Sequence, residues 1–283
     1  MVQRIGSALV ALLAALLAAA LFPSATVSAG DVPPDKRLVV ALYYPWYDAN
    51  TWTSGLTADL PLIPYNSADR ETIERHVGWA KDTNIDALIS AWYGPKDDNP
   101  TEGNLRTLLD VAHQKGIHAA ILLETDSDHF FPNRGALVEG LRRFLQVHAN
   151  HPGYLRVGGR PVIFVWRPTS VYAPEGHRVN AKNGAAVAAW RSLLDEVDPQ
   201  RRALWIAEGD YFAFLDVFDG IFPYSIAWSS DPARQLRSYG QRVADYNAQR
   251  GTNKLWIATA MPGYDDTRIP GRTPVFSVDR ANG

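Results

Sequence analysis

Cysteine is missing from all 283 residues of this chain. Its absence excludes a disulfide framework, a thiolate metal site and a cysteine nucleophile. Basic runs are missing as well, and the 28 lysines and arginines are outnumbered by 30 acidic residues, which gives a net charge of −2. Nucleic acid is therefore not an expected partner, because nothing here would neutralise a phosphate backbone. Stability must come from a large apolar core, which a 46% hydrophobic composition can supply.

The first 29 residues are expected to lie outside the folded domain. Arg4 is their single charged residue, an apolar run from about Ala8 to Leu21 follows, and Val27-Ser28-Ala29 offers small residues for cleavage. This order is typical of a secretory signal peptide, and the run is short for a membrane span of about 20 residues. We expect a secreted, cell-surface or periplasmic protein with no stable membrane insertion after cleavage. An uncleaved membrane anchor is the alternative.

Seven apolar runs follow, and most of them are separated by amphipathic stretches. The expected strands are 38–44, 85–91, 119–123, 161–165, 203–207, 220–222 and 255–260. The expected helices begin near Ser67 and then span about 102–115, 134–149, 184–197 and 232–250. Strands that are apolar on both faces belong to a parallel sheet that helices cover. Residues 154–157 and 161–165 flank Gly158-Gly159, so a hairpin is expected there.

This alternation predicts either a barrel or an open, doubly wound sheet. The open sheet usually has a glycine-rich phosphate turn after its first strand, whereas Tyr43-Tyr44-Pro45-Trp46-Tyr47 contains no glycine. We therefore expect an α/β fold of the (β/α)₈ TIM-barrel type, with residues 30–283 as one domain. Such a barrel takes about 250 residues and needs an eighth strand to close. No apolar run follows Ala260, so we expect the eighth strand and last helices to be missing from this chain. A seven-stranded open sheet is the alternative.

Chemistry in such barrels gathers at the carboxyl ends of the strands. Glu124 and Glu208 follow the third and fifth apolar runs, and glycoside hydrolysis needs two carboxyl groups, one protonated and one ionised. We predict these two as catalytic residues, and a salt bridge to Arg167 or Arg156 is the structural alternative. Aromatic rings at strand ends can cover the apolar face of a sugar. The predicted substrate-binding residues are Tyr44, Trp46, Tyr47, Trp92, Tyr93, Trp166 and Tyr224.

Other conspicuous residues are assigned to packing or to solvated loops. Asp126, Asp128 and His129 lack the glycine and final glutamate of a calcium loop, and no His-Glu-x-x-His motif occurs, so no metal site is expected. A Gly-x-Ser-x-Gly motif is also missing, which argues against a serine hydrolase. Core packing is expected for the tryptophans inside helices and strands, namely Trp79, Trp190, Trp205 and Trp256.

Several short motifs occur in an order that resembles glycoside hydrolase family 99. They are Tyr43-Tyr44-Pro45-Trp46-Tyr47, Pro64-Tyr65-Asn66-Ser67, Ser90-Ala91-Trp92-Tyr93-Gly94, Leu123-Glu124 and Pro262-Gly263-Tyr264-Asp265-Asp266-Thr267. The resemblance implies a (β/α)₈ barrel and endo-acting, retaining hydrolysis of internal α-mannosidic bonds in an oligosaccharide or polysaccharide, without a metal or organic cofactor. It also implies that a sugar subsite is lined by Trp92, Glu124 and Tyr224, with Tyr44 and Trp46. It gives no role to Glu208.

The chain departs from the family at its catalytic pair. In the family, one carboxylate takes a proton from the sugar's own 2-hydroxyl, giving an anhydro-sugar intermediate, and a second acts as acid and then as base. Both lie in an Asn-Glu-Trp-like segment at the end of strand eight, and no glutamate occurs between Tyr264 and Gly283. We therefore expect a monomeric, exported glycoside hydrolase, present here as a fragment that is inactive by itself. The alternatives are a non-catalytic glycan-binding or surface-polysaccharide assembly protein on the same barrel, and a hydrolase of another α-linked glycan.

Overall fold

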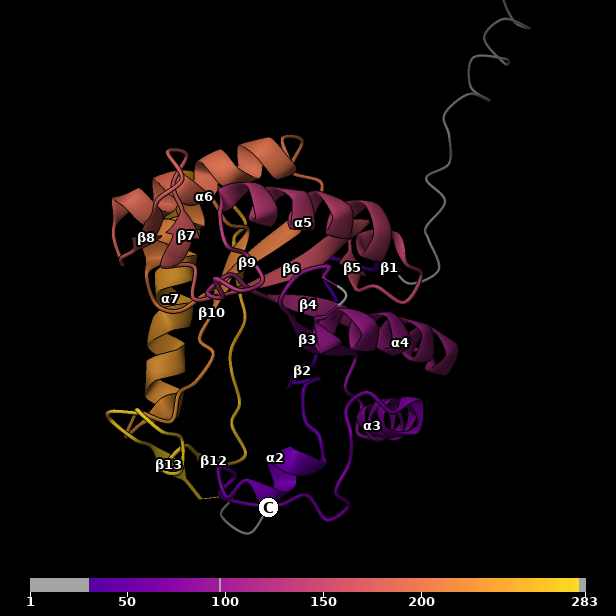
Figure 1. The fold of residues 1–283 in the computed structure, drawn as a ribbon. Coiled ribbons are helices and arrows are strands. Elements are labelled where there is room, and N and C mark those ends of the chain that lie inside the picture. Colours follow the sequence, from indigo (N-terminus) through magenta and orange to yellow (C-terminus); the bar gives the residue numbers. More distant parts are fainter. Residues whose placement is uncertain (1–30, 97, 280–283) are drawn as a thin grey trace, which may run out of the picture.

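A curved sheet of parallel strands forms the centre of the computed structural model, which describes residues 31–96 and 98–279 (Figure 1). All neighbouring strands along its main path run parallel. The inner strands are buried at nearly every position, as expected where both faces are covered. In spatial order the strands are β2 (Val40–Tyr43), β3 (Ala87–Trp92), β4 (His118–Glu124), β6 (Arg160–Trp166), β9 (Leu204–Glu208), β10 (Gly220–Phe222) and β11 (Leu255–Trp256).

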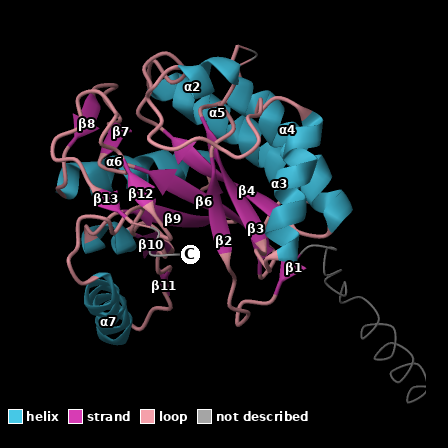
Figure 2. Ribbon diagram, turned by 90° about the horizontal axis from the view of Figure 1, so that it is seen from below, coloured by secondary structure: helices cyan, strands magenta, loops and turns pink. Residues whose placement is uncertain are grey.

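Helices lie around the outside of this curved row of strands (Figure 2). In the part of the chain that the structure describes, the long ones are α3 (Arg70–Asp82), α4 (Pro100–Lys115), α5 (Arg134–Val147), α6 (Gly184–Val197) and α7 (Pro232–Arg250). Local signals explain their ends. The Asn183 side chain caps α6, and α7 begins at Pro232 and ends before Gly251, which is left-handed at φ 63°. The predicted spans 184–197 and 232–250 are therefore confirmed.

Shorter elements complete the fold. As predicted, β5 (Arg156–Val157) forms an antiparallel hairpin with β6. The sequence pattern did not predict β1 (Asp31–Val32), which adds to β5 in parallel. Nor did it predict α2 (Ala49–Thr53), the pair β7 (Ser170–Tyr172) and β8 (Arg178–Asn180), or the pair β12 (Tyr264–Asp265) and β13 (Ser277–Val278). Two 3₁₀ turns are η1 (His148–Asn150) and η2 (Phe212–Asp216).

The sheet is a partial TIM barrel rather than a closed one. Within residues 31–96 and 98–279, β2 and β11 end the strand order and do not pair with each other. The last predicted strand, 255–260, is reduced to Leu255–Trp256, which has a partner on one side alone. No helix in this part of the chain has the length and apolarity to cross a membrane. The predicted signal peptide, 1–29, lies outside the described residues.

The tryptophans assigned to packing divide into two groups. Trp190 and Trp205 are fully buried, as predicted, and Trp256 is half-buried. Trp79 is 52% exposed, so the packing prediction is wrong for it. Its helix, α3, packs against α4 and β3, and the Trp79 ring lies 5.5 Å from His76, which hydrogen-bonds the Tyr43 hydroxyl of β2.

A buried polar cluster joins α4 to β3 and η1. Glu102 accepts a hydrogen bond from Trp92 Nε1 at 2.8 Å and from Arg106 Nη2 at 2.7 Å. His148 Nε2 lies 2.9 Å from the same carboxylate. Burial alone would raise the pKa of Glu102, but the hydrogen bonds from His148 and Trp92 and the charge of His148 lower it to about 2. Glu102 is therefore a buried anion whose charge stabilises the fold.

Replacing Glu102 by Gln is expected to lower the free energy of unfolding at pH 7 by about 2 kcal/mol, because a charged hydrogen-bonding group is lost in a buried site. A lowered folded pKa means that this contribution is complete above about pH 4.5 and is lost as the pH falls toward 2. Denaturant unfolding at several pH values measures both effects. Glu139→Gln, on the exposed side of α5, is the matched control. Equal stability of the two variants at pH 7 would contradict the assignment.

Candidate active site

Three side chains lie at one level at the carboxyl end of the sheet. Glu124 ends β4 and pairs in register with Trp166, which ends β6. Val165 pairs with Ala207, so Trp166 and Glu208 are also level. Side chains alternate between the two faces of a strand, and residues in register point to the same face. The two predicted carboxylates therefore flank one tryptophan on one face of the sheet.

Tyrosines from distant strands meet these residues. The Tyr44 hydroxyl, just past β2, hydrogen-bonds the Tyr224 hydroxyl, just past β10. The rings of Tyr224 and Trp166 are 4.2 Å apart. Since β2 and β10 lie toward opposite ends of the strand order, this contact crosses the mouth of the partial barrel. The charge of Glu124 contributes to the raised pKa values of Tyr44, Tyr93 and Tyr224, after the larger effect of burial, which places all three tyrosines near it.

An aromatic surface extends outward from this centre. Trp46 is 37% exposed, and its ring lies 5.0 Å from Tyr44 and 6.0 Å from Tyr93. The Tyr47 ring lies 6.1 Å from the Trp46 ring and packs against Trp52 in α2. We name the set Tyr44, Trp46, Tyr93, Trp166 and Tyr224 the aromatic rim. Flat faces with hydroxyl and indole groups at their edges suit the apolar faces and hydroxyls of a sugar.

Burial dominates the electrostatics of Glu124. Its residue is 8% exposed, and within the described residues no group donates a hydrogen bond to its carboxyl group. Burial, followed by the nearby charge of Asp126, raises the pKa of Glu124 to about 8. At neutral pH the group is mostly a neutral carboxylic acid, which can donate a proton or a hydrogen bond.

At Glu208, burial and hydrogen bonds shift the pKa in opposite directions. Burial raises its pKa to about 7, although hydrogen bonds from the backbone N–H groups of Tyr224 and Arg167 act in the opposite direction. The salt-bridge alternative does not account for either glutamate: Arg167 forms its ion pair with Asp126. Two carboxyl groups that titrate near neutrality supply both an acid and a base.

Neighbouring loops hold the strand ends in place. Asp126 also accepts a hydrogen bond from Ser170 Oγ at 2.9 Å, and Arg178 of β8 donates to the Thr125 carbonyl at 3.0 Å. In the described part of the chain, no three His, Asp or Glu side chains converge as metal ligands. Phe130 packs 5.5 Å from Tyr93 and extends the rim. Sequence reasoning missed Phe130, which lies in an irregular loop without a periodic signal.

Trp92 is the predicted substrate-binding residue that the structure places elsewhere. It is fully buried, 5.3 Å from the Phe144 ring in α5, with its indole N–H bonded to Glu102. It pairs in register with Leu123, so it points to the helix side, whereas the next residue, Tyr93, is level with Glu124. The prediction for Trp92 is therefore corrected to core packing. The sequence contained the signal for this: side chains alternate between the two faces along residues 87–92, so Trp92 and Tyr93 must point to opposite faces of the sheet.

Replacing Glu124 by Gln is expected to stabilise the protein at high pH. A carboxyl pKa raised to about 8 means that folding favours the neutral form, so wild-type stability declines as the pH rises from about 4.5 through 8. The variant should gain at least about 1 kcal/mol at pH 9 relative to pH 4, since one pKa unit corresponds to about 1.36 kcal/mol. Denaturant titrations measure the difference. Glu175→Gln, at an exposed position, should show no such trend. A pH-independent difference between wild type and Glu124→Gln would refute the raised pKa.

Comparisons with known proteins find similar sequences. The chain is 25% identical over 247 residues to a mouse glycoprotein endo-alpha-1,2-mannosidase-like protein, an alignment that covers 78% of this chain and 49% of the relative. A rat glycoprotein endo-alpha-1,2-mannosidase is 22% identical over 313 residues. That alignment covers 91% of this chain and 63% of the rat protein. The chain thus spans about half the length of the mouse relative.

The fold has a solved counterpart as well. A family 99 endo-alpha-mannosidase from Bacteroides thetaiotaomicron, in complex with bis-tris-propane, superposes with a TM-score of 0.63 at 21% identity. The superposition covers 87% of this chain and 76% of that one. The model of glycosyl hydrolase family 99 matches residues 57–283. With four fifths of its length matched, this chain belongs to glycosyl hydrolase family 99.

Proposed function

We propose that this chain is part of an exported glycoside hydrolase that cleaves internal α-mannosidic bonds in glycans. The observation that carries the proposal is the level row of Glu124, Trp166 and Glu208, with the Tyr44–Tyr224 contact across the mouth. Family membership supports hydrolysis of a glycosidic bond. The names of the mouse and rat relatives make α-1,2-linked mannose the first linkage to test. The signal-like first 29 residues support export.

In this proposal the aromatic rim binds the sugar, and the two glutamates exchange protons with it. The aromatic rim covers the apolar face of one or two sugar units and excludes water from it. Glu124, neutral near pH 7, donates a hydrogen bond or proton to a sugar oxygen, and Glu208, closer to half ionised, accepts one. Their protonation states differ because Glu208 accepts backbone hydrogen bonds and Glu124 does not.

We also propose that an eighth strand completes the barrel between β2 and β11. Both are edge strands in the described residues. Leu255 in β11 and Val39, just before β2, are 39% and 59% exposed, which is costly for apolar groups at a sheet edge. A strand inserted there would pair with both edges, and its carboxyl end would lie beside Tyr44 and Tyr224. Any further catalytic carboxylates on it would face the row formed by Glu124 and Glu208.

Replacing Trp46 by Ala is expected to weaken the binding of α-mannose oligosaccharides by about 1–2 kcal/mol, or roughly tenfold, because a stacking ring is removed from an exposed position. Calorimetric titration of residues 30–283 measures the affinity. Tyr246→Ala is the control, since Tyr246 lies near the end of α7 and its hydroxyl donates a hydrogen bond to Asp216, away from the aromatic rim. Equal affinities for the two variants would refute the aromatic rim as the binding surface.

Product analysis by mass spectrometry separates hydrolysis from binding alone. Release of an internal fragment, abolished in a Glu124→Gln/Glu208→Gln variant, supports hydrolysis by these residues. Binding that depends on Trp46 but yields no product, even in a protein that carries an eighth strand, favours a glycan-binding protein. If the protein binds no mannose oligosaccharide, the proposal that its substrate is an α-mannose glycan is wrong.

A further inference from the structure

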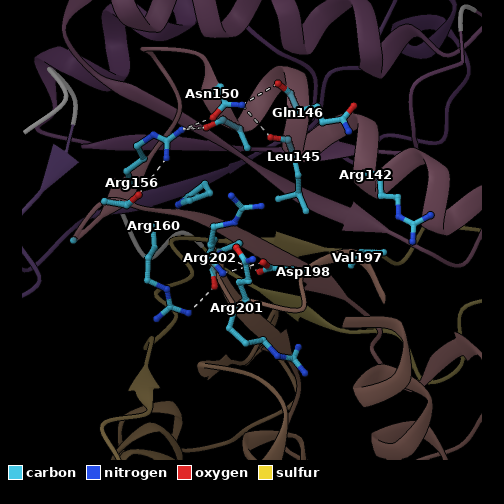
Figure 3. A pocket seen from close by; sticks show the side chains of 16 residues that line it. Arg142, Leu145, Gln146, Asn150, Arg156, Arg160, Val197, Asp198, Arg201 and Arg202 are labelled. Atoms are coloured by element: carbon cyan, nitrogen blue, oxygen red, sulfur yellow. Dashed lines mark hydrogen bonds between the residues drawn. The ribbon is translucent and has the colours of Figure 1, made fainter. Parts of the chain in front are cut away.

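A cavity of about 740 Å³ opens at the end of the sheet opposite to the glutamates. Its lining includes Arg160 at the start of β6 and Ala203 just before β9, and these strands end at Trp166 and Glu208 on the other side. The last turns of α5 and α6 and the Gly158-Gly159 turn of the hairpin complete its wall (Figure 3). The cavity lies at the middle of the strand order, away from the open edges β2 and β11. It is therefore not a product of the incomplete barrel.

Arginines dominate the walls of this cavity. The five are Arg142, Arg156, Arg160, Arg201 and Arg202, and we name them the arginine cluster. Figure 3 shows them coming from α5, from the hairpin and from the 198–203 loop around a common space. Three have carboxylate partners: Arg142 pairs with Glu196, Arg160 with Asp219 and Arg201 with Asp195. Among the described residues, no carboxylate pairs with Arg156 or Arg202.

The acidic residue in the lining does not neutralise these two arginines. Asp198 is 4% exposed and already accepts hydrogen bonds from the Arg202 N–H at 2.8 Å and the Ala203 N–H at 3.0 Å. The indole N–H of Trp205 donates a third, at 3.1 Å. Its oxygens are thus directed at the start of β9, and the Arg202 guanidinium has no acceptor in the described residues.

Two donor atoms of the arginine cluster lack an acceptor among the described residues. Arg160 Nε and Arg201 Nη1 are buried without any hydrogen-bond partner. Buried donors are normally paired, and unpaired donors on charged groups are especially unfavourable. An anion in the cavity would supply the missing acceptors.

Capping of helix ends accounts for part of the cluster. Arg156 donates to the Ala149 carbonyl in η1, and Arg142 donates to the Glu196 carbonyl near the end of α6. This role leaves the positive charge of Arg156 without a counter-ion and does not involve Arg202. Helix capping and ion pairs therefore account for four of the five arginines, whereas Arg202 is an exposed residue that lines the cavity without either.

We propose that this cavity binds a phosphoryl group carried by a larger molecule. A phosphomonoester carries close to two negative charges and three acceptor oxygens, which match the two guanidinium groups, those of Arg156 and Arg202, that have no carboxylate partner among the described residues. A carboxylate would neutralise one of them. The volume exceeds that of a free phosphate ion and falls in the range of small-molecule sites, about 300–1,000 Å³. Leu145, Pro161 and Val197 give the wall an apolar part for the rest of the ligand.

Calorimetric titration of residues 30–283 with mannose 6-phosphate, inorganic phosphate and unphosphorylated mannose tests the proposal. We expect saturable binding of the sugar phosphate, weaker binding of phosphate and none of mannose at this site. Arg202→Gln should weaken binding by roughly tenfold or more, because a charge-assisted hydrogen bond has an effect of that size. Arg237→Gln, at an exposed position of α7 without a described partner, is the matched control and should bind like wild type.

A second arm distinguishes a soluble ligand from a lipid headgroup. Sedimentation with vesicles of phosphatidylcholine and 20% phosphatidic acid, against phosphatidylcholine alone, tests the lipid source. Binding of sugar phosphate, or of the acidic vesicles, that needs Arg202 but not Arg237 supports the phosphoryl pocket and identifies its source. No saturable binding in either arm would overturn it, and so would equal losses in Arg202→Gln and Arg237→Gln. Thermal unfolding confirms that each variant is folded, and Arg202→Lys, which keeps the charge, should retain part of the affinity.

The outcome is independent of the proposed hydrolysis, because Glu124→Gln should leave phosphoryl binding unchanged. Conversely, Arg202→Gln should leave mannose-oligosaccharide binding at the aromatic rim unchanged. The two proposals can therefore fail separately.

Discussion

The parallel register of β4, β6 and β9 is the constraint on which the site depends. It sets Glu124, Trp166 and Glu208 level with one another, so the two carboxyl groups are held by backbone hydrogen bonds of a buried sheet rather than by flexible loops. The same alternation sends Trp92 to the helix layer and Tyr93 to the mouth. A shift of one residue in any of these pairings would reverse the faces and remove the site.

Burial at the mouth has a thermodynamic consequence. Glu124 lies in a position where its ionised form is disfavoured, and no described donor relieves that cost. Stability is given up locally to keep a carboxylic acid neutral, which is common at functional sites. The helix layer shows the opposite arrangement: Glu102 is also buried, but Trp92, Arg106 and His148 surround it, and its pKa is lowered instead. Hydrogen-bond partners, not depth alone, decide which glutamate serves the fold and which is available for chemistry.

Much of the fold was predictable because its signals are local. The caps and stop residues of α6 and α7 gave their bounds, and the apolar runs gave the central strands and the carboxyl-end positions of Glu124 and Glu208. The wrong or missing predictions concern elements whose formation depends on a neighbouring strand rather than on their own sequence. The last strand is short because nothing described pairs with its outer edge, and β1 exists because β5 offers it a partner. The Tyr44–Tyr224 contact joins residues 180 positions apart and depends on the curvature of the sheet. The arginine cluster is collected from separate elements between residues 142 and 202, so no spacing along the chain announces it.

The pairing of β1 with β5 fixes the point at which the chain enters the folded domain. Asp31 enters the fold beside the Gly158-Gly159 turn, at the amino-terminal end of β6, and the Gly159 N–H donates to its carboxylate at 2.7 Å. A leader kept as an anchor would therefore hold the domain by its base. In that orientation the arginine cluster would lie on the membrane side of the domain. The aromatic rim and the two glutamates would lie on the opposite side, facing solvent.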